Sequence, residues 1–358
     1  MTKKELYETI TKVGGKLTYP FDYKNLTLDY LDYVTALIEE FLPLIEQLDD
    51  VSVKALNESL PEDIVNFPLA RPLSLLDDVR FVADITKEVL QLSYRTYHSE
   101  AYNKLLEFFS KDDHHFFMLL PRLEMKGYDF YRMRTGDIDW SNSQGEMFHI
   151  PFQLRHLVST QRYSIPGYPV IYLASNLETA WYELNQPDIY NTTSAKFKFK
   201  DMAIFIDLGY PLRENPSDWE LYCLFVFYPL FIACSVGVKY PEAPFKVEYM
   251  MPQLMLRVVR NYDMIRGISY MSNKTPLQDD VFSLCYRNYV VITKNALCRE
   301  GYDESLAEKM MMTKPFRFEK EWFEKHGFSG VSDYAKIGLV SVEHVNDRFD
   351  DIQLRMKN

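Results

Sequence analysis

Residues 162–185 read Arg162-Tyr163-Ser164-Ile165-Pro166-Gly167-Tyr168-Pro169-Val170-Ile171-Tyr172-Leu173-Ala174-Ser175-Asn176-Leu177-Glu178-Thr179-Ala180-Trp181-Tyr182-Glu183-Leu184-Asn185, and this stretch decides the fold prediction. Pro166-Gly167 predicts a type II turn, because proline fixes φ at the second turn position and glycine accepts positive φ at the third. Residues 170–174 form a short apolar run of strand length. Ser175, with Glu178 three residues later, predicts a capping box at a helix start. The stretch therefore predicts a turn, a strand and a helix as one unit.

The predicted helix carries a carboxylate close to a phenol. Thr179, Ala180 and Glu183 share one helix face, since residues three and four apart are neighbours on a helix. Glu183 is expected one to two turns into the helix, which directly follows the strand that carries Tyr172. Two rigid elements would hold these side chains near each other, as a preorganised site requires. By spacing alone, Glu183 is better explained as a solvated helix glutamate.

The same residues carry a family resemblance. The string Arg-Tyr-Ser-x-Pro-Gly-Tyr-Pro-x-x-Tyr-Leu-Ala-Ser, followed by Glu183, resembles the RES domain, a family named for its Arg, Glu and Ser. Upstream, Phe130-Tyr131-Arg132 resembles the first motif of that family. Downstream, residues 265–272 resemble the segment that ends in its Ser. The three segments occur in the family's order and extend over about 128–293.

The resemblance implies an enzyme that breaks NAD⁺ at the nicotinamide–ribose bond. The implied fold is α+β, with a mixed sheet similar to that of ADP-ribosylating toxins. NAD⁺ would be the substrate, and no separate cofactor is implied. The residues implied as catalytic are Glu183, Arg132 and Ser272, and those implied to bind NAD⁺ are Tyr131, Tyr172, Arg162 and Ser164.

Each implied role has a chemical reason and an ordinary alternative. A carboxylate at Glu183 would stabilise the oxocarbenium-like ribose. Arg132 would bind the pyrophosphate through its planar fork of donors, or else be a strand-end arginine in an ion pair, a position that Arg134 could equally fill. Tyr172 would stack on a base, or simply pack in the sheet. Ser272 would hydrogen-bond a phosphate or the ribose.

The resemblance leaves the acceptor of the ribosyl group open. Many family members have Gly-Gly-Arg-Trp before the central strand, whereas this chain has Arg-Tyr-Ser-Ile-Pro-Gly at 162–167. Hydrolysis or phosphorolysis by a toxin-like enzyme is the first hypothesis. The alternatives are an ADP-ribosyltransferase that modifies a protein, and a binding module without turnover. Because a free active toxin would harm its host, the resemblance also implies a neutralising antitoxin.

Three regions are predicted along the chain. Residues 1–120 are expected to form a helical domain, 121–300 the RES-like catalytic domain, and 301–358 an extension packed on it. The clearest helix follows an apolar stripe, and Pro43 inside the stripe is expected to kink it or end it early. The stripe consists of Leu31, Val34, Ile38, Phe41, Ile45 and Leu48.

Composition restricts the partners and the compartment. A net charge of -11 and the lack of a basic stripe argue against nucleic acid. Four cysteines without zinc-type spacing, and a His-Asp cluster at 111–115 that fits a solvated loop, predict no metal. The uncharged segment 221–238 reaches the lower limit for a membrane span, but a buried helix, or a helix broken at Pro229, explains it better. The N-terminal residues lack a signal-peptide core. We therefore expect a cytoplasmic protein without a membrane span.

Overall fold

The computed structural model describes residues 1–12, 14–61, 74–110, 116–209, 215–276, 286–294, 297–328 and 340–341. The chain divides into two compact units. The helical unit comprises Met1–Arg122 and Ile206–Asn261. The sheet unit comprises Leu123–Phe205, Tyr262–Pro276 and the described residues from 286 onward. The helical unit thus extends beyond the predicted 1–120 range, because a later segment packs with the N-terminal helices.

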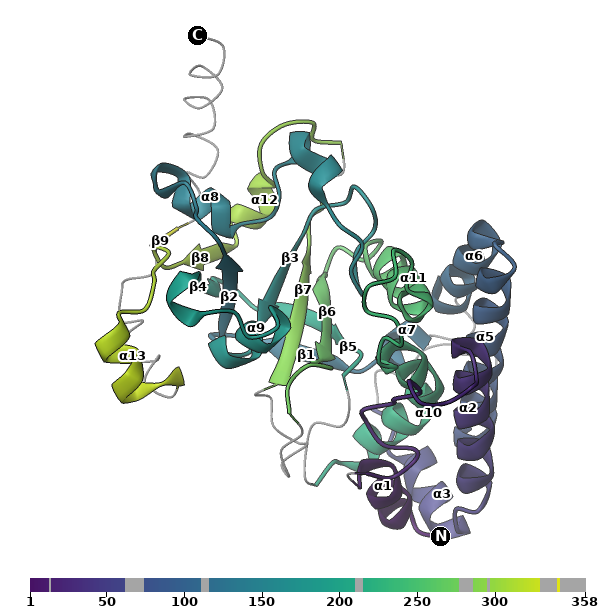
Figure 1. The fold of residues 1–358 in the computed structure, drawn as a ribbon. Helices are drawn as coiled ribbons and strands as arrows, with labels where there is room; N and C mark the ends of the chain where they lie inside the picture. Colours follow the sequence, from purple (N-terminus) through teal and green to yellow (C-terminus); the bar gives the residue numbers. More distant parts are fainter. Residues whose placement is uncertain are drawn as a thin grey trace. The chain divides into compact units, whose positions relative to one another are not determined.

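Helices make up the helical unit, in agreement with the periodicity of its sequence (Figure 1). Its α-helices are α1 (Lys3–Thr11), α2 (Tyr30–Glu46), α3 (Asp50–Glu58), α5 (Leu75–Tyr94), α6 (His98–Ser110), α7 (Phe116–Leu119), α10 (Asp218–Ser235) and α11 (Met250–Val259). The apolar stripe lies on α2, where Val34, Ile38 and Phe41 are completely buried. Pro43 lies in the last turn of α2, which ends at Glu46.

Helix α10 is the core helix of the helical unit and packs on α2, α3, α5 and α11. It is the one described helix long and apolar enough to cross a membrane, with a mean hydropathy of 1.2, and 78% of it is buried. It runs without a break through Pro229. The hydroxyl of Tyr222 donates to Asp78 Oδ2 (2.5 Å), and that of Tyr30 on α2 donates to the Ala233 carbonyl (2.5 Å). Of the two favoured accounts, the buried helix is therefore the one observed.

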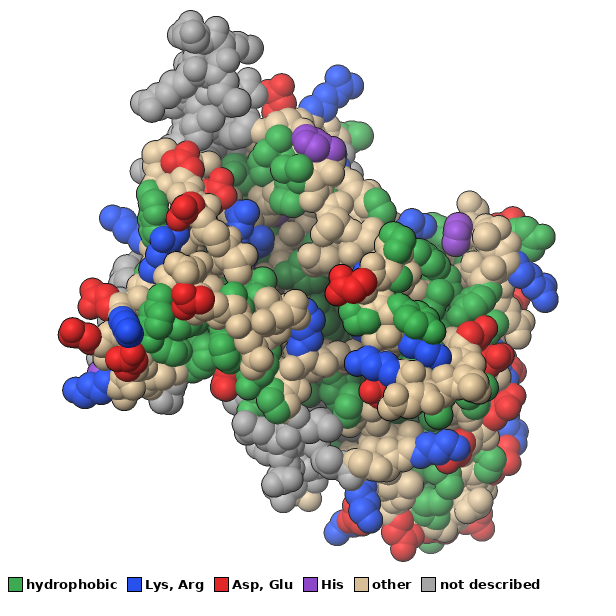
Figure 2. Space-filling model, in the orientation of Figure 1, with side chains coloured by type: hydrophobic (Ala, Val, Ile, Leu, Met, Phe, Trp, Pro, Cys, Tyr) green, Lys and Arg blue, Asp and Glu red, His purple; other side chains and the backbone are tan. Residues whose placement is uncertain are grey.

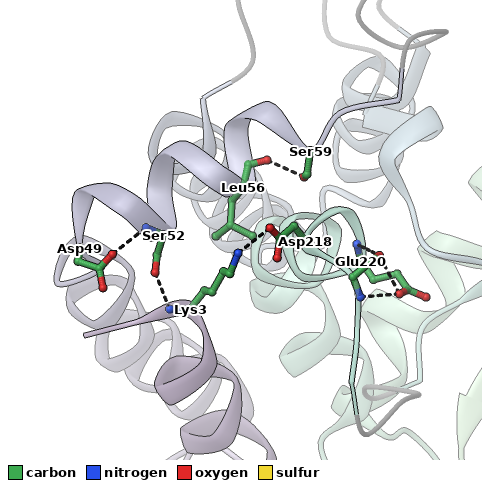
Figure 3. A network of polar contacts seen from close by, with 8 residues as sticks. Lys3, Asp49, Ser52, Leu56, Ser59, Asp218 and Glu220 are labelled. Atoms are coloured by element: carbon green, nitrogen blue, oxygen red, sulfur yellow. Dashed lines mark hydrogen bonds and ion pairs between the residues drawn. The ribbon is translucent and has the colours of Figure 1, made fainter.

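A polar network joins α1, α3 and α10 (Figure 3). The Lys3 backbone N–H donates to Ser52 Oγ (2.9 Å), and Asp49 caps α3 by accepting from the Ser52 N–H (2.7 Å). The Lys3 ammonium pairs with Asp218 in the first turn of α10 (2.6 Å). Glu220 completes a capping box on that same turn. These contacts fix the helix ends that enclose the core.

A nine-stranded sheet forms the centre of the sheet unit, in the order β1-β5-β6-β7-β3-β2-β4-β8-β9 (Figure 1). The strands are β1 (Arg122–Met125), β2 (Asp129–Thr135), β3 (Val170–Ala174), β4 (Thr192–Phe199), β5 (Ala203–Asp207), β6 (Ile265–Met271), β7 (Arg287–Ile292), β8 (Met310–Met312) and β9 (Val340–Ser341). The short helices are η1 (Trp140–Asn142), α8 (Ser143–Met147), η2 (Phe152–Leu157), α9 (Leu177–Glu183), η3 (Ile189–Asn191), α12 (Glu304–Ala307) and α13 (Lys320–His326), and η4 (Val247–Tyr249) belongs to the helical unit. The α+β prediction is confirmed.

Two apolar clusters cover the two faces of the central strands. The first cluster includes Phe130, Phe148, Phe197, Phe205 and Tyr289. The second contains Met133, Ala174, Leu177, Ala180, Ile189, Phe316 and Phe318, and therefore lies on the face that α9 covers. Strands β2 and β3 share one paired position, Tyr131 opposite Ala174, whereas β2 pairs with β4 along its whole length. The two strands therefore diverge on either side of that pair.

Charged side chains of both signs are interspersed over the face shown in Figure 2. Large exposed hydrophobic side chains also occur, among them Val51, Tyr240, Phe245 and Leu297. A cavity of about 510 Å³ lies inside the helical unit, between Tyr7 of α1, residues 118–122 and α10. No predicted site residue lines this cavity.

Candidate active site

The turn before β3 forms as the sequence predicts. The Tyr168 N–H donates to the Ile165 carbonyl (2.9 Å), and Gly167 has a φ of 75°, the value that the third position of a type II turn requires. Ser164, which was predicted to bind NAD⁺, makes its hydrogen bonds within this loop. Its hydroxyl accepts from the Gln161 N–H (2.7 Å) and donates to the Ser159 carbonyl (3.0 Å). These two bonds fix the loop that leads into the strand.

The predicted capping box at Ser175 is wrong by one residue. Asn176 is the N-cap of α9, and its side chain accepts from the Thr179 N–H (2.7 Å). Ser175 instead continues the pairing of β3 with β7: its N–H donates to the Arg287 carbonyl (2.9 Å), and its Oγ accepts from the Arg287 N–H (3.1 Å). Sheet pairing therefore extends past Ala174, and the helix begins one residue later.

Helix α9 places Glu183 at its C-terminal end. The helix has 7 residues, and Glu183 is the last of them. Thr179 and Ala180, which share its face, are buried against the sheet. The chain then leaves through Asn185 and Gln186, which have φ values of 62° and 54°. Because these left-handed residues turn the chain away at once, the Glu183 side chain is left half-buried above the sheet.

Two hydrogen bonds fix the Glu183 carboxylate through one of its oxygens. Oε1 accepts from the Ser272 hydroxyl (2.6 Å), which lies directly after β6, and from the Asn288 amide (2.6 Å) on β7. Within the part of the chain that the structure describes, no side chain or N–H donates to Oε2. Both donors are neutral and buried, so they orient the charge without cancelling it.

Lys274 links the loop after β6 to the end of α9. Its exposed ammonium donates to the Glu183 backbone carbonyl (2.6 Å), and its backbone N–H donates to Ser272 Oγ (3.3 Å). A lysine at this position satisfies a terminal helix carbonyl and interacts favourably with the negative end of the helix dipole. Lys274 thus links Ser272, through its backbone N–H, to the end of α9, through its ammonium.

Two tyrosines lie on the same sheet face as Asn288, which holds this carboxylate. Tyr270 is opposite Asn288 in the β6–β7 ladder, and Tyr172 is opposite Val290 in the β3–β7 ladder. Since side chains alternate along a strand, both tyrosines project to the face of Asn288. Tyr163 packs on Tyr270 with ring centroids 4.7 Å apart, which brings the loop that contains buried Arg162 to this region.

Tyr131 lies on the face of α9, and its neighbour Arg132 does not. Tyr131 packs with the second cluster, whereas Phe130, one residue before it, belongs to the first. Arg132 pairs with Ala195, and strand alternation therefore directs it to the side of Phe130. Among the described residues, no hydrogen bond or ion pair joins Arg132 to Glu183, Ser272 or Asn288. Burial, together with Asp129, raises the pKa of the Tyr131 phenol to about 12.

Arg132 is a half-buried cation without a partner among the described residues. Its Nη1 is buried and makes no hydrogen bond. Burial, and secondarily the charge of Arg134, lower the pKa of the Arg132 guanidinium to about 10, while Glu146 acts in the opposite direction. Arg134 forms an ion pair with Glu146 (2.8 Å). The sequence had allowed such an ordinary ion pair for either arginine. The two arginines are therefore not equivalent.

Asn288 is the contact that sequence reasoning missed. It lies near the start of β7, directly before the residues Tyr289 to Ile292, and is 4% exposed. A buried amide needs hydrogen-bond partners, so a lone asparagine in such a strand was the available signal. The described residues contain no group of three His, Cys, Asp or Glu that could hold a metal. The predicted loop at 111–115 lies outside the described residues, as does Cys285; Cys223, Cys234 and Cys298 are free thiols.

Comparison with known proteins gives one informative similarity. The chain is 30% identical over 213 residues to a Bacillus subtilis (strain 168) protein named "Putative toxin YopC". The match covers 55% of this chain and 47% of that protein, so the chain spans about half the length of its relative. No protein-family model and no solved structure match the chain. The RES resemblance and the implied fold similarity therefore stay predictions.

Proposed function

We propose that this protein is an enzyme that cleaves the nicotinamide–ribose bond of NAD⁺, with Glu183 as its central catalytic residue. The observation that carries this proposal is the state of the Glu183 carboxylate. Ser272 and Asn288 hold one oxygen at 2.6 Å each, and the other oxygen accepts no bond from the described residues. A charge fixed in this way is preorganised to act on a ligand.

The chemistry needs such a carboxylate and little else. Nicotinamide leaves as a neutral molecule from a positively charged ring, so its departure requires no general acid. The ribose that remains has oxocarbenium character, and a nearby negative charge stabilises it more than it stabilises the substrate. The free Oε2 of Glu183 would face this cation or accept from a ribose hydroxyl. Ser272 would act through Glu183.

Arg132 supports an anionic substrate. A partly buried guanidinium without a carboxylate partner is costly, and a pyrophosphate would supply two acceptors for its planar fork. Arg132 projects to the sheet face opposite Glu183, so NAD⁺ would have to pass between β2 and β3 for its pyrophosphate to reach this guanidinium while its nicotinamide ribose lies at Glu183. Strand β2, which carries Arg132, diverges from β3 beyond their one paired position. Tyr172, on the face of Glu183, offers a ring for stacking.

The similarity to a protein named as a toxin supports a toxin-like role. Removal of NAD⁺ would stop the metabolism of the cell that contains the enzyme. We therefore include in the proposal a cytoplasmic site of action, where NAD⁺ is available, and a protein antitoxin that neutralises the enzyme. The chain spans about half the length of that relative, so the site of action and the antitoxin are proposed for this chain and are not taken from the relative.

Nicotinamide release from NAD⁺ by the purified chain is the decisive measurement. We expect release by the wild type and its near loss in Glu183→Gln. Glu178→Gln, on the same helix and without a bond to Ser272 or Asn288, is the matched control and should stay active.

Release that depends on added phosphate indicates phosphorolysis, and release without phosphate indicates hydrolysis. Label from adenine-labelled NAD⁺ on a protein would favour an ADP-ribosyltransferase. A folded wild type that releases no nicotinamide would contradict the proposal and favour a binding module.

A further inference from the structure

Asn288 and Glu183 are far apart in the sequence but in direct contact. The Asn288 amide reaches Glu183 Oε1 from β7, across the sheet face from the end of α9 (2.6 Å). Asn288 is 4% exposed, whereas Glu183 is half-buried. Asn288 lies between Ala174 of β3 and Tyr270 of β6, its partners in the two ladders. A substrate could therefore reach Glu183, while the asparagine lies beneath it.

We propose that Asn288 is the positioning residue that sets the orientation of Glu183, an inference that rests on the proposed function. Ser272 alone leaves the carboxylate free to rotate about the bond to its single donor. A second donor on the same oxygen, from a different strand, removes that freedom. Oε1 then faces the sheet and Oε2 faces away from both donors. Asn288 acts on the reaction through Glu183 and not by touching the substrate.

The position of Asn288 explains why a neutral donor is present there. A lysine or arginine would neutralise the charge that the ribose cation needs, and an aspartate would repel Glu183. An amide donates one N–H and adds no charge. The amide group also comes from a strand that pairs on both edges, with β3 and with β6, so its backbone is held rigidly.

The test is a double-mutant cycle with wild type, Asn288→Leu, Glu183→Ala and the double variant. Leucine has the same branching and the same number of side-chain heavy atoms as asparagine, and it removes the donor. We expect Asn288→Leu to lower kcat about tenfold, with KM changed less than about twofold, because a misdirected carboxylate loses rate and not binding. In the Glu183→Ala background, Asn288→Leu should change kcat by less than about twofold. Asn191→Ala, which removes an exposed asparagine bond to Asp188, is the control.

Two kinetic outcomes would overturn the proposal. A raised KM at unchanged kcat would mean that Asn288 contacts the substrate. The same tenfold loss in both backgrounds would mean that it acts independently of Glu183. If Asn288→Leu fails to fold, Asn288→Ala takes its place in the cycle.

The melting temperature of the same four proteins gives a readout that needs no activity. Asn288→Leu should lower the Tm of the wild type by a few degrees. In Glu183→Ala, where the buried amide has lost its acceptor, the same change should leave the Tm unchanged or raise it. An equal loss of Tm in both backgrounds would contradict the proposed coupling between Asn288 and Glu183. A wild type without nicotinamide release would refute the proposed function, and the melting cycle would still decide whether Asn288 holds Glu183.

Discussion

Glu183 is the residue on which the proposed chemistry depends, and its surroundings make it easy to test. Glutamine at 183 retains a carbonyl oxygen that can accept from both Ser272 and Asn288. The substitution therefore removes charge and keeps shape. The functional and structural contributions of the side chain can be separated for this reason.

We predict that Glu183→Gln lowers kcat by a factor on the order of 10² to 10³, which corresponds to about 3 to 4 kcal/mol of lost transition-state stabilisation. The free energy of unfolding should change by about 0.5 kcal/mol or less. Steady-state kinetics and denaturant unfolding measure the two quantities. Full activity with normal stability would show that the catalytic carboxylate lies elsewhere.

Arg132 should affect the binding of NAD⁺ more than the rate of the chemical step, unlike Glu183. We expect Arg132→Met to raise KM for NAD⁺ more than it lowers kcat, because the lost contact is to the pyrophosphate in substrate and transition state alike. The Tm should stay the same or rise, since a half-buried cation without a partner costs stability. Arg134→Met is the matched control and should lose the ion pair with Glu146. A large drop in Tm for Arg132→Met would show that the guanidinium supports the fold.

At the scale of elements, helix α9 and the segment around His149 can be tested through stability. Asn176→Ala should destabilise the protein by about 1 kcal/mol, because it removes the N-cap of α9. Glu178→Gln should cost much less, since no capping box exists at Ser175. Equal effects of the two substitutions in denaturant unfolding would contradict this assignment of the cap.

His149 predicts a loss of stability in mild acid. It is 1% exposed and accepts at Nε2 from the Asp303 N–H (2.8 Å), which requires the neutral ring. Burial lowers the pKa of His149 to about 4, against the backbone bond to Ile150, which raises it. Because the folded pKa lies below the unfolded value, the unfolded state binds more protons between about pH 6.5 and 4. Stability therefore falls as pH decreases through that window, by an amount on the order of 2 to 3 kcal/mol.

Unfolding free energies measured between pH 4 and 8 test this dependence. His149→Gln should be less stable at pH 7 and should lose most of the pH dependence in this window. The same substitution at His156, an exposed residue of η2, is the matched control. An unchanged slope in His149→Gln would assign the acid sensitivity to other groups.

At the scale of the whole molecule, the helical unit is discontinuous in sequence. Helix α10 lies at its core but follows most of the sheet strands along the chain. A fragment of residues 1–120 lacks α10 and α11 and would expose the apolar faces of α2 and α5. We predict that this fragment does not fold cooperatively, whereas the full chain does. Circular dichroism with thermal melting compares the two, and a cooperative transition in the fragment would contradict the prediction.

Local sequence determined the elements of this protein. The turn at Pro166-Gly167, the strand at 170–174 and the apolar stripe of α2 depend on φ preferences and periodicity, which act within a few residues. That Glu183 and Ser272 belong to one site was implied only by a family resemblance, and their direct contact was not predicted. Asn288 and the later start of α9 were not predicted at all.

Tertiary structure decided these last features because they depend on pairing between distant strands. The ladder with β7 takes Ser175 away from the helix and brings Asn288 under Glu183. Strand alternation alone separates Arg132 from Tyr131, but only the placement of α9 shows which of the two faces Glu183. The sequence favoured a buried helix at 221–238, and the fold shows which helices bury it, among them α2, α3 and α5, which precede it by more than 100 residues. A sequence shows the preferences of each segment, and only the fold shows which groups those preferences bring into contact.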